Sequence, residues 1–152
     1  MINVIKTNSE NPDFQNLVKL LDKDLDIRYG DKQEFYSQFN KLDSIHHVIV
    51  AYQNEIAVAC GAIKKYSDDA VEIKRMFVHP QHRGKGLGKL VLVSLENWAR
   101  ELNYSYCVLE SGNKQPEAVS LYSQSGYLVI PNYGQYENDE NSICMKKQIT
   151  HE

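Results

Sequence analysis

The sequence is poor in cysteine, and its few cysteines are scattered. Cys60, Cys107 and Cys144 are an odd number, and none of them has C-x-x-C spacing. Such a sparse, odd count suits a reducing compartment rather than a disulfide framework. Each cysteine lies in an apolar, strand-like context, so we expect three small buried hydrophobic side chains rather than a nucleophile or metal ligands.

The sequence also lacks a long apolar run and a surplus of positive charge. No stretch approaches the ~20 apolar residues of a membrane-spanning helix, and Met1–Val4 lacks the layout of a signal peptide. We therefore expect a cytoplasmic chain with no membrane partner. The 17 basic and 20 acidic residues give a net charge of −3. That balance argues against a nucleic-acid partner, because nonspecific nucleic-acid binders usually carry a basic surplus.

A basic, glycine-rich segment stands out in this acidic chain. Residues 71–90 are typical of a strand, a tight turn and the start of a helix. Glycines let the backbone turn sharply and approach a ligand closely. The free N–H groups and the positive dipole end of a helix N-terminus favour an anion, and Arg83, Lys85 and Lys89 add formal positive charge. The segment therefore predicts a binding site for a phosphate group.

Two common phosphate-binding motifs are absent from this segment. A Walker A loop requires Ser or Thr after its lysine, and here Lys89 is followed by Leu90. The dinucleotide motif G-x-G-x-x-G is absent because neither Gly84-x-Gly86 nor Gly86-x-Gly88 has a glycine three residues further on. The alternative to a phosphate site is an ordinary tight connection whose basic residues face water.

The motif that does fit is Gln81-x-x-Gly84-x-Gly86. Here the sequence resembles the GCN5-related N-acetyltransferase (GNAT) family, whose pyrophosphate-binding signature is [Q/R]-x-x-G-x-[G/A] after a strand and at the start of a helix. A second segment resembles the family's "N…A…LY…GF/Y" pattern. Its matching residues are Asn113, Ala118, Val119, Leu121, Tyr122, Gly126 and Tyr127. The resemblance covers essentially the whole chain and is best from residue 71 to residue 129.

The periodicity of the chain predicts an α/β (α+β) fold in a single domain, residues 1–152. We expect a mixed, mostly antiparallel central sheet of six or seven strands flanked by about four helices. The expected strands are residues 2–6, 46–52, 56–66, 70–78, 104–110, 127–130 and 142–147, and the expected helices are residues 12–29, 32–39, 87–102 and 116–125. A strand–helix–strand crossover is right-handed and joins parallel strands, so strands 70–78 and 104–110 should be parallel.

The resemblance implies that the ligand of the basic turn is acetyl-CoA, used as a cosubstrate. The residues implied for the pyrophosphate are Arg83, Gly84, Lys85, Gly86, Leu87, Gly88 and Lys89. The residues implied for the pantetheine arm are Met76, Phe77 and Val78, through their main chain, with Asn113 and Tyr122. The alternative role of Asn113 is to order the loop. No metal is expected, because His79 and His82 have no carboxylate or cysteine at a recognisable spacing.

The implied reaction transfers the acetyl group to a primary amine of a small molecule or peptide, by direct attack in a ternary complex. The family places a tyrosine acid where Tyr122 stands, so Tyr122 is the expected proton donor to the leaving sulfur. Glu72 is the expected base, acting through a water, or else it binds the substrate ammonium. The alternatives are a packing role for Tyr122 and a strand ion pair of Glu72 with Lys74 or Arg75.

The sequence says less about the residues that bind the acceptor amine. Family members with an Arg-Tyr pair at the end of the first helix imply Arg28 and Tyr29 as acceptor-site residues, and Tyr133 and Tyr136 are placed to close over the acceptor. All four are open to a second reading as surface or packing residues. A homodimer is compatible with the family. Two other functions stay open: a catalytically silent CoA-binding regulatory module of the same fold, and a binder of nucleotide phosphates.

Overall fold

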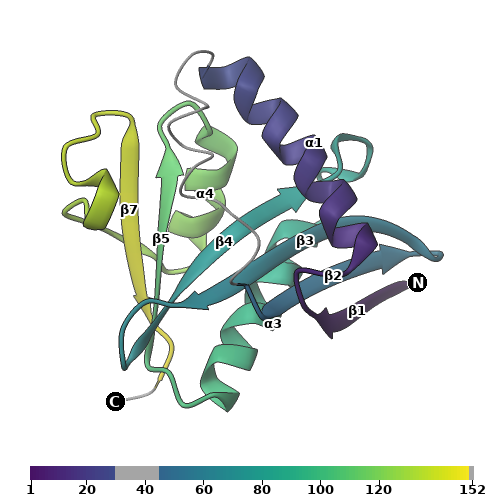
Figure 1. Cartoon of the computed structure of the whole chain (residues 1–152), viewed down its shortest axis with the longest axis horizontal. Coiled ribbons are helices and arrows are strands. Elements are labelled where there is room, and N and C mark those ends of the chain that lie inside the picture. The colour runs from purple at the N-terminus through teal and green to yellow at the C-terminus, as the bar shows by residue number, and fades with distance from the viewer. Residues whose placement is uncertain (30–44, 151–152) are drawn as a thin grey trace. The chain divides into compact units, whose positions relative to one another are not determined.

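The chain is described from a computed structural model, which covers residues 1–29 and 45–150 (Figure 1). Its strands are β1 (Ile2–Thr7), β2 (His47–Gln53), β3 (Ile56–Lys65), β4 (Ala70–Val78), β5 (Tyr106–Gly112), β6 (Leu128–Ile130) and β7 (Ser142–Gln148). Its α-helices are α1 (Pro12–Tyr29), α3 (Leu87–Glu101) and α4 (Pro116–Gln124), with short 3-10 helices η2 (Pro80–His82) and η3 (Gly134–Tyr136). The helix expected at residues 32–39 lies outside the described residues.

The strands form one mixed sheet of seven strands in the order β1-β2-β3-β4-β5-β7-β6. Antiparallel pairing joins β1 to β2, β2 to β3, β5 to β7 and β6 to β7. The pair β4–β5 is parallel, with Glu72 opposite Val108. The predicted mixed sheet and its parallel central pair are therefore confirmed.

The predicted bounds of β5 are wrong by two residues at each end. The strand begins at Tyr106 because the N–H groups of Ser105 and Tyr106 both donate to the carbonyl of Asp69, which closes a turn there. It continues through the expected turn to Gly112, because Gly112 still pairs with Ser142 on β7.

The chain divides into two compact units, and the division falls within β4 and within α3. Unit 1 comprises residues 1–64 and 74–95, and unit 2 comprises residues 65–73 and 96–152. Each unit is described by itself below. The single domain expected from the length stays a prediction.

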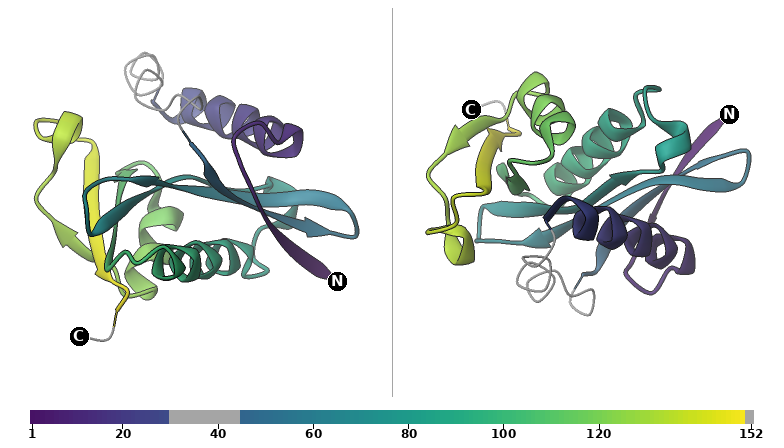
Figure 2. Two further views of the ribbon diagram at one scale, coloured as in Figure 1. Left: turned by 60° about the horizontal axis from the view of Figure 1, so that its bottom comes forward. Right: turned by 90° about the horizontal axis from the view of Figure 1, so that it is seen from above.

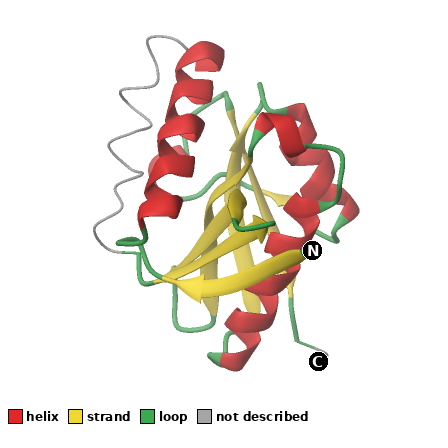
Figure 3. Cartoon of the chain, turned by 90° about the vertical axis from the view of Figure 1, so that its right-hand side faces the viewer, coloured by secondary structure: helices red, strands yellow, loops and turns green. Residues whose placement is uncertain are grey.

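Unit 1 packs its strands between two helices. Helix α1 begins where predicted, because the Asn11 side chain accepts a hydrogen bond from the N–H of Phe14 and Pro12 occupies the first helical position. The helix lies over one face of β2 and β3 (Figures 2 and 3). Its apolar side chains pack against that face. This core consists of Phe14, Leu17, Val18, Leu21, Ile45, Val48, Val50, Cys60, Ala62 and Phe77.

The opposite face of β3 lies directly against α3. A Cβ added to Gly61 would come within 2.5 Å of the Met76 sulfur and 2.9 Å of side-chain carbons of Val91 and Leu95. A larger residue at this position would force those side chains to shift, so glycine allows the close approach of β3 and α3.

Unit 2 has a sheet with two different faces. Because side chains alternate along a strand, the register places Glu72, Glu110 and Cys144 on one face. Cys107 and Lys147 lie on the other face.

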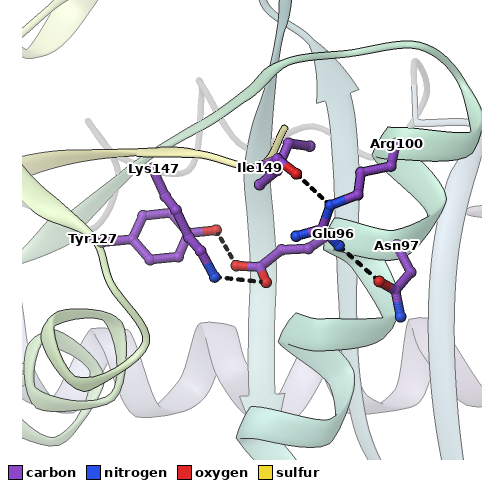
Figure 4. Close-up of polar contacts among 6 residues, drawn as sticks. All are labelled: Glu96, Asn97, Arg100, Tyr127, Lys147 and Ile149. Atoms are coloured by element: carbon purple, nitrogen blue, oxygen red, sulfur yellow. Dashed lines mark hydrogen bonds and ion pairs between the residues drawn. The ribbon is translucent and has the colours of Figure 1, made fainter. Parts of the chain in front are cut away.

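The second face of the unit 2 sheet carries a buried ion pair. The Lys147 ammonium lies 3.0 Å from Glu96 of α3, and the Tyr127 hydroxyl donates to the other Glu96 oxygen at 2.9 Å (Figure 4). Beside them, Arg100 donates to the Ile149 carbonyl.

All three cysteines of the sequence are free thiols and buried, as predicted. Among the helices that the structure describes, none combines the length and apolar character needed to cross a membrane.

Candidate active site

The turn between β4 and α3 has the backbone geometry that the motif predicted. Gly84 and Gly86 have φ values of 81° and 78°, in the left-handed region that glycine adopts without a steric penalty. A Cβ at either position would meet no atom within 4 Å, so the main chain faces open space. The N–H of His79, which precedes η2, donates to the Val58 carbonyl at 2.8 Å and fixes the start of the turn.

The first turn of α3 presents unpaired donors. The first hydrogen bond of the helix runs from the Leu90 N–H to the Gly86 carbonyl at 3.1 Å. The N–H groups of residues 87–89 therefore have no acceptor within the helix. Leu87 is buried and anchors this end, whereas Lys85 and Lys89 are exposed. The arrangement can bind an anion through main-chain donors and lysine ammonium groups.

Arg83 has a contact that sequence reasoning missed. Its Nε donates to the Val78 carbonyl at 3.1 Å, and its guanidinium carbon lies 5.6 Å from the centre of the Phe77 ring. Arg83 therefore joins the turn to the end of β4. The assignment of Arg83 to the pyrophosphate stays a prediction. In the structure Arg83 contacts Phe77 and Val78, two of the residues expected to bind the pantetheine arm.

The middle of β4 is irregular at Arg75. Its φ of 59° is left-handed, a conformation that costs a non-glycine residue about 1–2 kcal/mol and that occurs at β-bulges. The carbonyl of Arg75 accepts a hydrogen bond from the Cys60 thiol at 3.4 Å, and the guanidinium pairs with Asp22 of α1 at 2.9 Å. These contacts stabilise the irregularity, which changes the direction of the main chain immediately before Met76.

Glu72 lies in a cluster with the predicted acceptor-side tyrosines. The Tyr133 hydroxyl donates to Glu72 Oε2 at 2.7 Å. The Tyr133 ring lies edge-on to the Tyr136 ring at 6.0 Å and to the Tyr66 ring at 4.9 Å between centroids. The structure therefore brings Glu72, Tyr133 and Tyr136 together. Arg75, a suggested ion-pair partner of Glu72, instead pairs with Asp22.

The tyrosines of this cluster stay protonated at neutral pH. Burial and then the negative charge of Glu72 raise the pKa of Tyr133 far above its usual value. Burial, followed by the charges of Glu110 and Glu72, raises the pKa of Tyr136. Tyr133 is therefore a hydrogen-bond donor and Glu72 the acceptor. Tyr66 was not predicted here, because nothing local to the β3–β4 turn indicates a partner more than 60 residues away.

Tyr122 is buried on α4 with its ring 5.8 Å from that of Tyr127. Burial, and then the charge of Glu110, raises the pKa of Tyr122 above its usual range. Glu110 also accepts a hydrogen bond from the Ser142 hydroxyl at 2.7 Å. The same carboxylate thus acts electrostatically on Tyr122 and on Tyr136.

The remaining predicted residues have contacts of their own or lie at the end of an element. The main-chain N–H of Asn113 donates to the Asn141 carbonyl at 2.7 Å, so Asn113 orders the loop after β5. Arg28, in the last turn of α1, forms an ion pair with Asp24 at 3.2 Å. Tyr29 is the last residue of α1, and its side chain lies outside the described part of the structure.

Comparisons with known proteins agree with this geometry. The chain matches the model of the acetyltransferase (GNAT) family over residues 14–127. It is 34% identical over 102 residues to an IAA acetyltransferase from Azospirillum brasilense, a match that covers 66% of this chain and 67% of that protein.

Solved structures of acyltransferases are also similar to the chain over nearly its whole length. A proposed acyl-CoA N-acyltransferase from Klebsiella pneumoniae has a TM-score of 0.83 at 27% identity, and the match covers 99% of both chains. A GNAT family acetyltransferase from Elizabethkingia anophelis, with acetyl-CoA bound, has a TM-score of 0.73 at 17% identity over 97% of both chains. The second likeness concerns the fold alone.

Proposed function

The chain belongs to the acetyltransferase (GNAT) family, and from that membership we propose that it is an acetyl-CoA-dependent N-acetyltransferase. The acceptor is a primary amine of a small molecule or peptide, which attacks the donor directly in a ternary complex. The observation that carries the proposal is the exposed basic turn with left-handed glycines between β4 and α3. The similar protein from Elizabethkingia anophelis was solved with acetyl-CoA bound.

The residues of unit 1 suit the donor. Open space over Gly84 and Gly86 lets a pyrophosphate approach the main chain. The free N–H groups of residues 87–89, with Lys85 and Lys89, would then neutralise its charge. The peptide-like pantetheine arm would pair with the main chain of residues 76–78 in the manner of an added strand. Acetyl-CoA supplies an acetyl group activated as a thioester.

Glu72 is the proposed group for the acceptor amine. An amine attacks only in its neutral form, so a base must take its proton. Glu72 is half-buried, and its Oε2 is held by the Tyr133 hydroxyl at 2.7 Å. We assign Glu72 to receive the proton through a water, or to hold the ammonium group before it is deprotonated. The amine nitrogen forms the new C–N bond as the C–S bond breaks.

Tyr122 is the proposed donor to the leaving sulfur. Its raised pKa keeps the phenol protonated at neutral pH. A thiol has a pKa of ~8.5, below that of the buried tyrosine, so complete proton transfer from Tyr122 would be uphill. Its contribution is therefore a hydrogen bond to the developing thiolate. The proton lost by the amine passes to buffered solvent, and the CoA thiolate is protonated from that solvent after it departs.

Calorimetric titration with acetyl-CoA, with CoA and ATP as comparison ligands, tests the donor site. We expect micromolar binding of acetyl-CoA, which is about −8 kcal/mol, and weak binding of ATP. Gly86→Ala should weaken acetyl-CoA binding about tenfold, because a left-handed Ala costs ~1–2 kcal/mol in the conformation that presents the main chain.

Gly126→Ala is the matched control for Gly86→Ala. Gly126 also has a positive φ, 96°, but it follows α4 and is not part of the turn. Its variant should bind acetyl-CoA like the parent. If both variants lost acetyl-CoA affinity equally, the loss would come from backbone strain anywhere in the chain and not from the turn between β4 and α3. Absence of binding in a folded parent would remove the proposed function.

The rival functions make different predictions in the same experiments. A silent CoA-binding module would bind acetyl-CoA but release no free thiol with any amine of a broad panel. A nucleotide-phosphate binder would take ATP as tightly as CoA. Release of CoA that depends on an added amine supports the transferase alone.

A further inference from the structure

Tyr133 and Glu72 form a contact that the reaction proposed above does not by itself require. They are 61 residues apart in the chain and meet through a 2.7 Å hydrogen bond from the phenol to Oε2. Tyr133 lies in the segment between β6 and β7, immediately before η3. A short hydrogen bond to an ionised acceptor is about twice as strong as a neutral one.

The Tyr133 ring is held from two sides. Tyr136, which is 3% exposed, lies edge-on at 6.0 Å between ring centroids. Tyr66 lies edge-on from the β3–β4 turn at 4.9 Å. Edge-to-face aromatic pairs are worth ~0.5–1.5 kcal/mol beyond their area. The hydroxyl of Tyr133 is therefore aimed by two ring contacts rather than by its own loop alone.

Other ionisable groups surround the carboxylate. On the packed elements of unit 2, Tyr136 and the Cys144 thiol both interact electrostatically with Glu72, and both also interact with Glu110. The same sheet face carries Lys146 of β7, whose ammonium lies 4.2 Å from the centre of the Tyr106 ring. Of the groups named here, Tyr133 is the one whose hydrogen bond to Glu72 is seen directly.

We propose that Tyr133 is a positioning residue for Glu72, fixing Oε2 and with it the orientation of the whole carboxylate. This inference rests on the proposed function, in which Glu72 handles the amine proton. The hydrogen bond holds one oxygen, so the orientation of the other is set before the substrate binds. Tyr133 acts through Glu72 and makes no bond to the reacting atoms.

The variant that tests this is Tyr133→Phe, which keeps the ring and removes the hydroxyl. A hydrogen bond to a charged group is among the stronger polar contacts of a folded protein. With an amine of the panel that supports CoA release, we therefore expect kcat to fall about tenfold. The KM for that amine and the acetyl-CoA affinity should stay close to those of the parent. Tyr104→Phe, a tyrosine of the α3–β5 loop, is the matched control.

A double-mutant cycle with Glu72→Gln separates positioning from simple packing. If Tyr133 acts through Glu72, the Phe substitution has no further effect on kcat in the Glu72→Gln background. If the two losses multiply, or if Tyr133→Phe keeps the kcat of the parent, the inference is overturned. Folding is checked by the urea midpoint of each variant, because a destabilised protein would lower activity in both backgrounds.

A second measurement does not depend on activity. The side-chain carboxyl carbon of Glu72, assigned by its loss in Glu72→Gln, can be observed by NMR at neutral pH. Its chemical shift should move in Tyr133→Phe, because the hydrogen bond to Oε2 is lost, and should stay in place in Tyr104→Phe. An unchanged chemical shift in Tyr133→Phe overturns the inference. A Glu72 signal that responds to Tyr133→Phe in a protein without acetyl transfer would instead remove the proposed function and leave the contact established.

Discussion

In the described part of unit 2, Glu72 and Glu96 each accept a hydrogen bond from a tyrosine hydroxyl. The two carboxylates differ in burial and in their charged partners. Glu96 is 2% exposed, receives Tyr127 at 2.9 Å and pairs with Lys147 at 3.0 Å (Figure 4). Glu72 is half-buried on the opposite sheet face and receives Tyr133 at 2.7 Å. The comparison teaches that two tyrosine–carboxylate pairs on one sheet can differ in burial and in the charged partners of the carboxylate.

The buried pair has the cost and the rigidity of an internal ion pair. Removing two charges from water is expensive, and their attraction offsets this only with good geometry and further hydrogen bonds. Glu96 has a close ion pair with the Lys147 ammonium and a further hydrogen bond from the Tyr127 hydroxyl. The half-buried Glu72, in contrast, lies among aromatic rings and remains close enough to solvent to exchange a proton.

The largest expected effect breaks the buried pair. Lys147→Met leaves the Glu96 charge without its cation, and removing one partner of a buried pair typically costs about 3–5 kcal/mol. Because the Lys147 side chain is 24% exposed, we expect a value near the lower end, about 3 kcal/mol, in urea unfolding. Lys146→Met, the neighbouring exposed lysine, should cost less than about 1 kcal/mol. Equal losses would show that Glu96 does not depend on its partner.

An intermediate effect compares the two tyrosines at high pH. Burial raises the pKa of Tyr127 and of Tyr133 in the folded chain, so folding keeps protons that the unfolded chain releases above its pKa of ~10. Their contribution to stability is complete below pH ~10 and is lost as the pH rises above it. Each such group adds a slope of about −1.4 kcal/mol per pH unit to the free energy of unfolding.

Phenylalanine variants resolve the two contributions. In Tyr127→Phe and in Tyr133→Phe the free energy of unfolding should fall less steeply as the pH rises. The difference in slope corresponds to at most one proton and is measured from urea midpoints between pH 9 and pH 11. Tyr127 is buried and Tyr133 is half-buried, so the larger change belongs to Tyr127→Phe. A steeper slope in either variant would contradict the sign of the pKa shifts. Cys60, with its pKa raised to about 12, adds to the slope of every variant equally. Cys107 interacts with the Tyr127 hydroxyl, so part of the change in Tyr127→Phe belongs to that thiol.

The smallest expected effect sharpens the role of the aromatic support. Tyr66→Ala removes one edge contact of the Tyr133 ring, worth about 0.5–1.5 kcal/mol. The ring keeps its contact with Tyr136, so we expect a loss of only a few-fold in kcat/KM and little loss of stability, since Tyr66 is half-exposed. A loss as large as that of Tyr133→Phe would mean that the ring contacts, and not the hydroxyl, control Glu72.

The parts of the fold that could be predicted are those with local causes. Gly84 and Gly86 indicate a left-handed turn because other residues are strained there. The periodic apolar residues of α1 and α3 indicate helices, and the handedness of the crossover indicates that β4 and β5 are parallel. Each of these signals lies within one stretch of the chain.

The parts that could not be predicted depend on contacts between distant residues. Nothing in the sequence around Arg75 distinguishes it from an ordinary strand residue, because its left-handed backbone is stabilised by Asp22 and Cys60. The Tyr133–Glu72 hydrogen bond has the same character. The ends of β5 were misjudged because they depend on residues outside the strand. A carbonyl of the β3–β4 turn determines where β5 begins, and the partner strand β7 determines where it ends.

The burial of all three cysteines has a practical consequence for following the reaction. Burial raises the pKa of Cys60 and Cys107 to about 12 and also raises that of Cys144, so the folded chain carries almost no thiolate near neutral pH. The thiolate is the form that reacts with disulfide reagents. A colorimetric thiol reagent added to a turnover mixture would therefore count released CoA against a silent background, and a rising background would itself report that the protein had unfolded.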